Sequence, residues 1–157
     1  MVFAAGFAIA AAAGAVGPKL LPADQAFRLS ARALDSKTLE IRFDVADGYY
    51  LYRDKLKVGI EPASAAPGAP DLPPGKVIED EFFGRVATYR GPVLIRVPLA
   101  GGQAGQSLEV AVESQGCADA GVCYPPQKQH LTVTLPAAGA PPGAPVSAGP
   151  PKKSYFN

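Results

Sequence analysis

The stretch TLEIRFDV, residues 38 to 45, alternates between apolar and polar side chains along its length after Thr38. Successive side chains of an extended chain point to opposite faces of a sheet, so this pattern buries one face and solvates the other. The stretch therefore predicts a β-strand that covers a hydrophobic core. Its apolar side is formed by Leu39, Ile41, Phe43 and Val45.

Similar runs occur elsewhere in the chain and suggest further strands. They are FRLSARAL (27–34), YYLYRDKLKVGI (49–60), PVLIRVPL (92–99), SLEVAV (107–112) and HLTVTL (130–135). Turn signals at Asp47-Gly48, Arg90-Gly91-Pro92 and Gly101-Gly102 separate them. Pro98 lies inside a strand pattern and indicates a sheet edge or a bulge. Together these runs predict an all-β fold, an antiparallel β-sandwich.

Composition sets limits on the function. A length of 157 residues suggests one domain with some length to spare. The net charge of +1 gives no electrostatic case for nucleic acid or for an acidic partner, so we expect no nucleic-acid binding. Glycine and proline number 17 each, which is too many for a helical bundle and fits strands joined by loops.

Both ends of the chain have a composition of their own. Residues 1–17 are apolar and Ala-rich, too short for a membrane span of about 20 residues, and they resemble a secretory signal without its positive start. An Ala-rich helix or a disordered tail is the alternative. Residues 137–157 are rich in Pro, Ala and Gly, which predicts a linker or tail that buries too little surface to fold. The folded domain is expected over residues 18–136, with a long irregular connection at 61–75.

Cys117 and Cys123 are the cysteines of this chain, and they are close in sequence. A structural disulfide here would close a loop of about seven residues and contribute only about 2 to 2.5 kcal/mol. A zinc site with His130 and Asp119 is a second possibility, but zinc sites usually have tighter cysteine spacing. The third is redox exchange, because a close pair cycles between dithiol and disulfide without unfolding the sheets.

One longer motif around the cysteines is more specific than their spacing. GCADAGVCYPPQ (116–127) resembles the active-site segment of the N-terminal periplasmic domain of the DsbD family, the thiol:disulfide interchange proteins. PADQAF (22–27), DGYYLYRDKL (47–56) and EDEFFG (79–84) match the same family in the same order. The resemblance covers residues 20–135 and implies an immunoglobulin-like sandwich with a cap loop over the active site.

The resemblance also implies a function. In that family the domain takes electrons from a membrane-embedded domain and reduces periplasmic thioredoxin-fold partners, such as disulfide isomerases and cytochrome c maturation thioredoxins. Cys123 would form the mixed disulfide with the partner, and Cys117 would resolve it. This implies a protein-disulfide reductase, one domain of the complete enzyme, that needs no cofactor because its two sulfurs carry both electrons. We expect a monomer in the periplasm, tethered to the inner membrane in the full-length protein.

The cap loop implied by the resemblance is Asp80-Glu81-Phe82-Phe83-Gly84, with Phe82 as the shield of the disulfide. The family commonly has tyrosine where this chain has Phe83, so a hydroxyl is lost. Asp80 and Glu81 would raise the pKa of a nearby thiol, because anions disfavour the thiolate. Without the resemblance, the same residues describe a solvated acidic turn with two aromatic anchors.

Tyrosines of the segment before the connection complete the candidate site. In a strand, Tyr50 and Tyr52 share one face, whereas Tyr49 and Leu51 take the other. The resemblance places Tyr50 and Tyr52 beside the disulfide, packed under the cap and hydrogen-bonded to the acidic pair. Ordinary core packing is the alternative. For the whole chain, the functional alternatives are an extracytoplasmic binding module with a purely structural disulfide, and a zinc-binding module.

Overall fold

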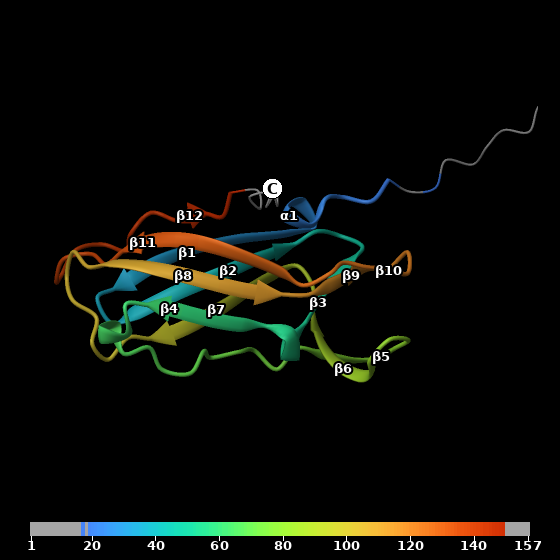
Figure 1. Ribbon diagram of the computed structural model, residues 1–157, viewed down its shortest axis with the longest axis horizontal. Helices are drawn as coiled ribbons and strands as arrows, with labels where there is room; N and C mark the ends of the chain where they lie inside the picture. The colour runs from blue at the N-terminus through green and yellow to red at the C-terminus, as the bar shows by residue number, and fades with distance from the viewer. Residues whose placement is uncertain (1–16, 18, 150–157) are drawn as a thin grey trace, which may run out of the picture.

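The computed structural model of the protein describes residues 17 and 19–149 (Figure 1). The predicted signal-like segment lies outside these residues except for its last position, Gly17. Within the described part, no helix is both long and apolar enough to cross a membrane. The helical elements are short: α1 (Ala23–Ala26) and the 3-10 turns η1 (Arg53–Lys55) and η2 (Ala63–Ala65).

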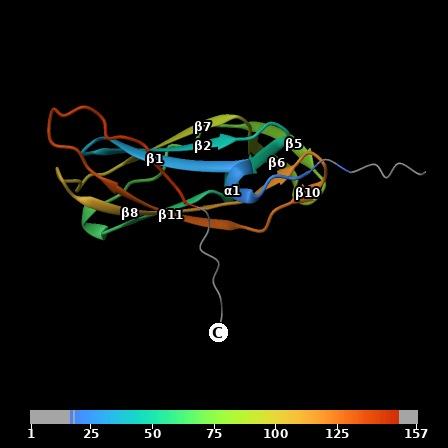
Figure 2. The same ribbon diagram turned by 90° about the horizontal axis from the view of Figure 1, so that it is seen from above.

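Two antiparallel sheets form the body of the domain and lie face to face (Figure 2). The first has the order β12-β1-β2-β7, and the second the order β11-β8-β4. The strands of the first sheet are β1 (Phe27–Asp35), β2 (Thr38–Val45), β7 (Pro92–Pro98) and β12 (Val146–Ser147). Those of the second are β4 (Lys57–Glu61), β8 (Ser107–Ser114) and β11 (Gln127–Thr134). The predicted all-β antiparallel sandwich is thus confirmed.

A third sheet continues the sandwich at one end, where Figure 1 shows its strands grouped together. Its order is β10-β9-β3-β6-β5. The strands are β3 (Tyr49–Tyr52), β5 (Lys76–Asp80), β6 (Gly84–Tyr89), β9 (Gly116–Ala118) and β10 (Val122–Cys123). Both cysteines and the predicted cap loop belong to this sheet, so the candidate site lies at the end of the sandwich.

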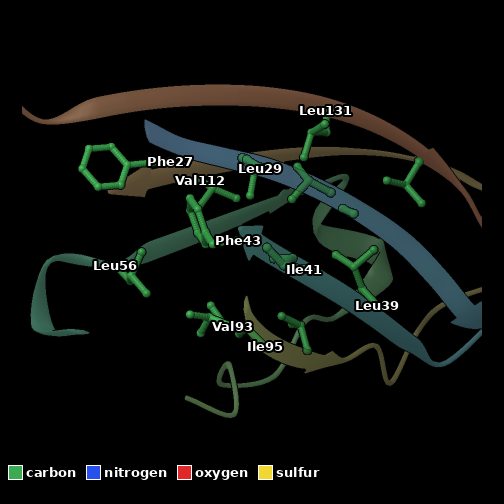
Figure 3. Close-up of a cluster of buried hydrophobic side chains, with 14 of the residues drawn as sticks. Phe27, Leu29, Leu39, Ile41, Phe43, Leu56, Val93, Ile95, Val112 and Leu131 are labelled. Carbon is green, nitrogen blue, oxygen red and sulfur yellow. The ribbon is translucent and has the colours of Figure 1, made fainter. Parts of the chain in front are cut away.

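The hydrophobic core lies between the first and the second sheet (Figure 3). The apolar face predicted for residues 38–45 is buried, with Leu39, Ile41 and Phe43 fully inaccessible. Leu108, Val110 and Val112 of β8 fill the same space from the opposite layer. Strict alternation in the sequence therefore identified core strands correctly.

The segment YYLYRDKLKVGI is not the single strand that its residues suggest. It forms β3, the turn η1 and β4, and β3 pairs with β6 and β9 whereas β4 pairs with β8. The turn carries the chain from the third sheet to the second. Every residue of β3 is buried, which no alternating pattern of one solvated face would produce.

Pro98 lies in β7, the edge strand of the first sheet, as predicted. The long connection of residues 61–75 runs along that edge, where the amide of Gly68 donates to the carbonyl of Pro98 at 2.8 Å and the amide of Asp71 donates to the carbonyl of Arg96 at 2.8 Å. The irregular connection thus covers part of an edge that would otherwise be open to pairing with another chain.

Part of the Pro/Ala/Gly-rich segment is folded onto the domain, which corrects the expectation that it buries too little surface to fold. β12 pairs with β1, with Ser147 opposite Ser30 and Val146 opposite Ala31. The amides of Gly143 and Ala148 donate to carbonyls of β1 at 2.9 Å each, and Ala148 packs against the core. A short strand pairs here through its backbone and needs no apolar pattern.

Candidate active site

Cys117 and Cys123 form a disulfide with a sulfur–sulfur distance of 2.01 Å. They lie directly opposite each other across the hairpin of β9 and β10, with their Cα atoms 4.0 Å apart. The close spacing in the sequence is therefore the spacing of a tight hairpin. The bond closes a local loop and joins no distant parts of the domain.

The two sulfurs are in different surroundings. Cys117 is 1% exposed, whereas Cys123 is half-buried. Both cysteines line a surface cavity of about 260 Å³, together with Phe82 of the cap loop. A protein thiol approaching from solvent therefore reaches Cys123 more easily than Cys117.

Tyr50 and Tyr52 of β3 lie beside the disulfide, where the resemblance places them. Tyr50 is opposite Cys117 in the pairing of β3 and β9. The Tyr52 hydroxyl oxygen is 3.0 Å from the sulfur of Cys117 and 3.8 Å from that of Cys123. Tyr49, on the other face of β3, is part of the main core.

Asp80 joins these tyrosines to the cap loop. Its Oδ2 accepts hydrogen bonds from the hydroxyls of Tyr50 at 2.7 Å and Tyr52 at 2.9 Å. Its Oδ1 accepts from the backbone amides of Phe82 at 2.8 Å and Phe83 at 2.9 Å. One carboxylate thus satisfies donors from two elements, and the side chain is 8% exposed.

These contacts change the pKa values of the network. Burial raises the pKa of Asp80, but the hydrogen bonds from Tyr50, Phe82, Phe83 and Tyr52 together outweigh it, so its pKa lies below the usual value. Burial, followed by the hydrogen bond to Asp80, raises the pKa of Tyr50 and of Tyr52. At neutral pH Asp80 is therefore an anion beside two neutral phenols.

The cap loop is the turn between β5 and β6. Phe82 is 53% exposed and Phe83 is 43% exposed. The Phe83 ring packs edge-on against Tyr52 at 5.0 Å between centroids, and the ammonium of Lys55 lies 4.7 Å from its centre. Gly84 ends the turn with φ of 71°, a backbone conformation that residues with a Cβ rarely adopt. The resemblance implies that Phe82 alone is the shield, yet Phe83 makes the edge-to-face contact with Tyr52.

Gly116 allows the hairpin to lie close to its support. A Cβ at this position would lie 2.4 Å from the carbonyl oxygen of Tyr50 and 2.6 Å from the Phe27 ring. The ring of Tyr124, which follows the hairpin, packs against Phe27 at 5.5 Å, and its hydroxyl donates to the carbonyl of Leu21 at 2.5 Å. The segments 22–27 and 116–127, distant in sequence, therefore meet beside the cysteine hairpin.

Sequence analysis missed a second polar contact at the site. The guanidinium of Arg90 donates to both carboxylate oxygens of Asp119, at 2.7 and 3.0 Å, and lies 5.1 Å from the centre of the Tyr50 ring. The hydrogen bonds from Arg90 lower the pKa of Asp119 below its usual value. In the sequence, Arg90 is marked only as part of a turn signal and Asp119 only as a candidate zinc ligand.

The geometry does not support the alternative of a zinc site. His130 is exposed on β11, opposite Ala111 of β8, in a different sheet from the cysteines. Asp119 is held by Arg90. In the described part of the chain, no group of three or more His, Cys, Asp or Glu side chains could hold a metal ion.

Comparisons with known proteins identify the family. The family described as the N-terminal region of the thiol:disulfide interchange protein DsbD matches residues 17–135. The thiol:disulfide interchange protein DsbD of Ralstonia nicotianae is 47% identical over 130 residues, which are 82% of this chain and 21% of that protein. DsbD 2 of Pseudomonas aeruginosa is 43% identical over 128 residues, 80% of this chain and 20% of that protein. The chain thus spans about a fifth of the length of these relatives.

Solved structures agree with this match. The reduced N-terminal domain of Neisseria meningitidis DsbD has a TM-score of 0.70 and 32% identity, covering 83% of this chain and 96% of that one. The DsbD N-terminal domain complexed with the PilB N-terminal domain, also from Neisseria meningitidis, has a TM-score of 0.62 and 36% identity, covering 73% and 88%. The immunoglobulin-like sandwich implied by the resemblance fits these structures. This chain therefore belongs to the family of the N-terminal domain of the thiol:disulfide interchange protein DsbD.

Proposed function

We propose that this chain is a thiol–disulfide exchange domain that passes electrons to the disulfides of other proteins. The observation that carries the proposal is the asymmetry of the Cys117–Cys123 disulfide. Cys123 is half-buried at a surface cavity, whereas Cys117 is buried against Tyr52. Such an arrangement exposes one sulfur to a protein partner and leaves the buried sulfur to resolve the mixed disulfide.

The exchange proceeds in two steps. In the reduced domain the Cys123 thiolate attacks one sulfur of the partner's disulfide, that disulfide breaks, and the partner's other sulfur leaves as a thiolate. Cys117 then attacks the Cys123 sulfur as a thiolate, and the second partner cysteine leaves. The domain ends with the Cys117–Cys123 disulfide, and the partner has gained two electrons. The two sulfurs carry these electrons, so the reaction needs no further cofactor.

The donor and acceptors in this proposal are those of the family that the chain resembles. A membrane-embedded DsbD-type domain would return two electrons to the disulfide by the same exchange in reverse. Periplasmic thioredoxin-fold proteins, such as a disulfide isomerase or a cytochrome c maturation thioredoxin, would accept them. Support comes from the relatives' name and from the DsbD N-terminal domain solved with a PilB domain. We place the domain in the periplasm as a monomer, tethered to the inner membrane within a longer protein.

The cap loop has the role of a gate in this proposal. Phe82 lines the cavity in front of the disulfide, and Phe83 holds the loop against Tyr52. Asp80 and Glu81 place negative charge in the same loop, which disfavours thiolates and raises the thiol pKa. Small thiols would be hindered, whereas a protein partner could displace the loop through its binding surface.

Partner trapping tests the proposal. The Cys117→Ser variant keeps Cys123 free, and we expect it to form a covalent adduct with oxidised periplasmic thioredoxin-fold proteins on a non-reducing gel. The adduct should dissolve on reduction, and intact mass should place it at Cys123. The matched control is Cys123→Ser, whose remaining sulfur is buried and should give little adduct.

The binding-module alternative gives a different result. If iodoacetamide modifies Cys123 in the Cys117→Ser variant but no adduct forms with any of these partners, the exchange function is wrong. The disulfide would then have a structural role, and the loss of both cysteines would lower stability without removing binding.

A further inference from the structure

We propose that Arg90 is a positioning residue for the exchange reaction: it holds the turn of the cysteine hairpin and neutralises Asp119, so that Cys123 ionises more readily. This inference rests on the proposed function in one respect, because it assumes that Cys123 attacks the partner. It assigns to Arg90 a role that neither its sequence context nor its turn position indicates.

The geometry shows how Arg90 holds the hairpin. Arg90 follows β6, and its guanidinium forms a bidentate ion pair with Asp119. Asp119 lies between the two cysteines in the sequence. The same guanidinium donates to the carbonyl of Tyr49 at 3.3 Å and lies over the Tyr50 ring. Bidentate pairs between Arg and a carboxylate fix the relative orientation of the two side chains as well as their distance. Arg90 therefore ties the turn of the hairpin to β3, the strand that supports Cys117.

The backbone of the turn is attached at the same place. The amide of Asp119 donates to the carbonyl of Gly48 at 2.8 Å, just before β3. Backbone and side chain of Asp119 thus both connect the hairpin to the start of β3. The contact with Arg90 is about half exposed, so its loss should leave the core intact.

The charges around the disulfide explain why neutralising Asp119 matters. The charged residues that line the cavity are Glu79, Asp80, Glu81, Arg90 and Asp119. Four of these five are acidic, from the cap strand and loop and from the hairpin turn, and Arg90 is the cation among them. Tyr50 and Tyr52 face the disulfide from β3 with raised pKa values and are neutral at pH 7. Anions near a thiol raise its pKa, and Arg90 cancels one of them.

The two single substitutions should move the pKa of the Cys123 thiol in opposite directions. Arg90→Gln leaves Asp119 unpaired, so the thiol pKa rises and alkylation at pH 7 slows about two- to fivefold, the range for an exposed ion pair. Asp119→Asn leaves Arg90 unpaired, so the pKa falls and alkylation quickens by a similar factor. The double variant should return close to the starting rate. Arg90→Lys, which keeps the charge, should slow the reaction less than Arg90→Gln.

The experiment measures the ionisation of Cys123 directly. Each substitution is made in the full chain carrying Cys117→Ser, and iodoacetamide modification is followed by intact mass from pH 6 to 10. Arg32→Gln is the matched control, because Arg32 is also ion-paired, to Glu40 at 2.9 Å on the first sheet, and does not line this cavity. It should leave the Cys123 profile unchanged. Circular dichroism confirms that each variant is folded.

Opposite shifts of the two single variants, cancelling in the double variant, support the inference. A slower reaction in both single variants without recovery in the double would overturn it, since a purely structural contact behaves in that way. An unchanged pH profile in all variants would also overturn it. No partner takes part in the measurement, so a failed adduct with normal shifts would refute only the proposed function.

Discussion

Asp80 is the residue on which the cap and the tyrosines depend together. Its two oxygens accept hydrogen bonds from two phenols and two backbone amides, and its pKa is lowered in the fold. A carboxyl whose folded pKa is below its unfolded pKa stabilises the fold above the unfolded pKa. That contribution is lost as the pH falls through the folded pKa. The stability of this end of the domain should therefore decrease as the solution becomes acidic.

We predict that Asp80→Asn lowers the free energy of unfolding at pH 7 by about 1 to 3 kcal/mol, because hydrogen bonds to a charged acceptor are lost. The deficit should shrink below about pH 4, where Asp80 of the unfolded chain begins to protonate, and it should be lost as the pH falls through the lowered pKa of folded Asp80. Urea titrations of the oxidised chain at pH 7 and pH 3, followed by circular dichroism, measure both values.

Glu79→Gln is the control for Asp80→Asn, because it removes a carboxylate from the neighbouring, exposed position of the same strand. We expect a much smaller change from it at either pH. A deficit for Asp80→Asn that stays the same at pH 3 would show that the charge of Asp80 does not stabilise the fold.

At the scale of elements, the β5–β6 hairpin gives its two phenylalanines different tasks. Phe82 lines the cavity with the cysteines, while Phe83 packs edge-on against Tyr52 and has the ammonium of Lys55 over its ring. Phe83 thus attaches the loop to β3, and Phe82 borders the cavity that both cysteines line. In the proposed gate, Phe82 would be the cover and Phe83 the attachment.

We predict that Phe82→Ala and Phe83→Ala both speed the reduction of the disulfide by small thiols. An aromatic pair contributes about 0.5 to 1.5 kcal/mol, so losing the contact of Phe83 with Tyr52 should raise the open population, and the rate, about two- to tenfold. Phe82→Ala removes the cover itself and should act at least as strongly. Reactions with 2-mercaptoethanol are quenched at intervals, and intact mass spectrometry gives the rate of disulfide reduction.

Val77→Ala is the control for the cap variants, since Val77 is 52% exposed on β5 and does not line the cavity. Its rate should match that of the unmodified chain. An unchanged rate in Phe82→Ala would exclude the gate, whatever the behaviour of Phe83→Ala.

The elements also show which features a sequence reveals. The alternation of residues predicts β2 and β8, because the apolar side chains of each strand lie on one buried face and most of the polar ones on the other, even though Glu40 of β2 is also buried. β5 and β6 were missed because most of their residues are exposed or half-buried, so no apolar rhythm marks them. The resemblance located the cysteines, the cap and the tyrosines, but Arg90 and Asp119 are 29 residues apart and only folding brings them together.

At the scale of the whole molecule, the site and the strand β12 belong to different sheets. The disulfide is in the third sheet at one end of the sandwich, whereas β12 lies along the middle of β1 (Figure 1). The backbone bonds from Gly143 and Ala148 and the β12 ladder attach the segment to β1. Stability from this segment should therefore be separable from the chemistry of the cysteines.

We predict that a chain ending at Pro136 unfolds with a free energy about 1 to 2 kcal/mol lower than a chain ending at Gly149, because each backbone bond contributes about 1 kcal/mol net and the entropy cost of ordering the segment offsets part of the sum. Its disulfide should be reduced by 2-mercaptoethanol at the same rate, since β12 does not reach the cavity. Urea titration and the thiol reaction on the same two chains measure both. Equal stability would mean that residues 137–149 act only as the linker that their composition suggests. A faster thiol reaction in the shorter chain would mean instead that β12 restrains the cap through the body of the sandwich.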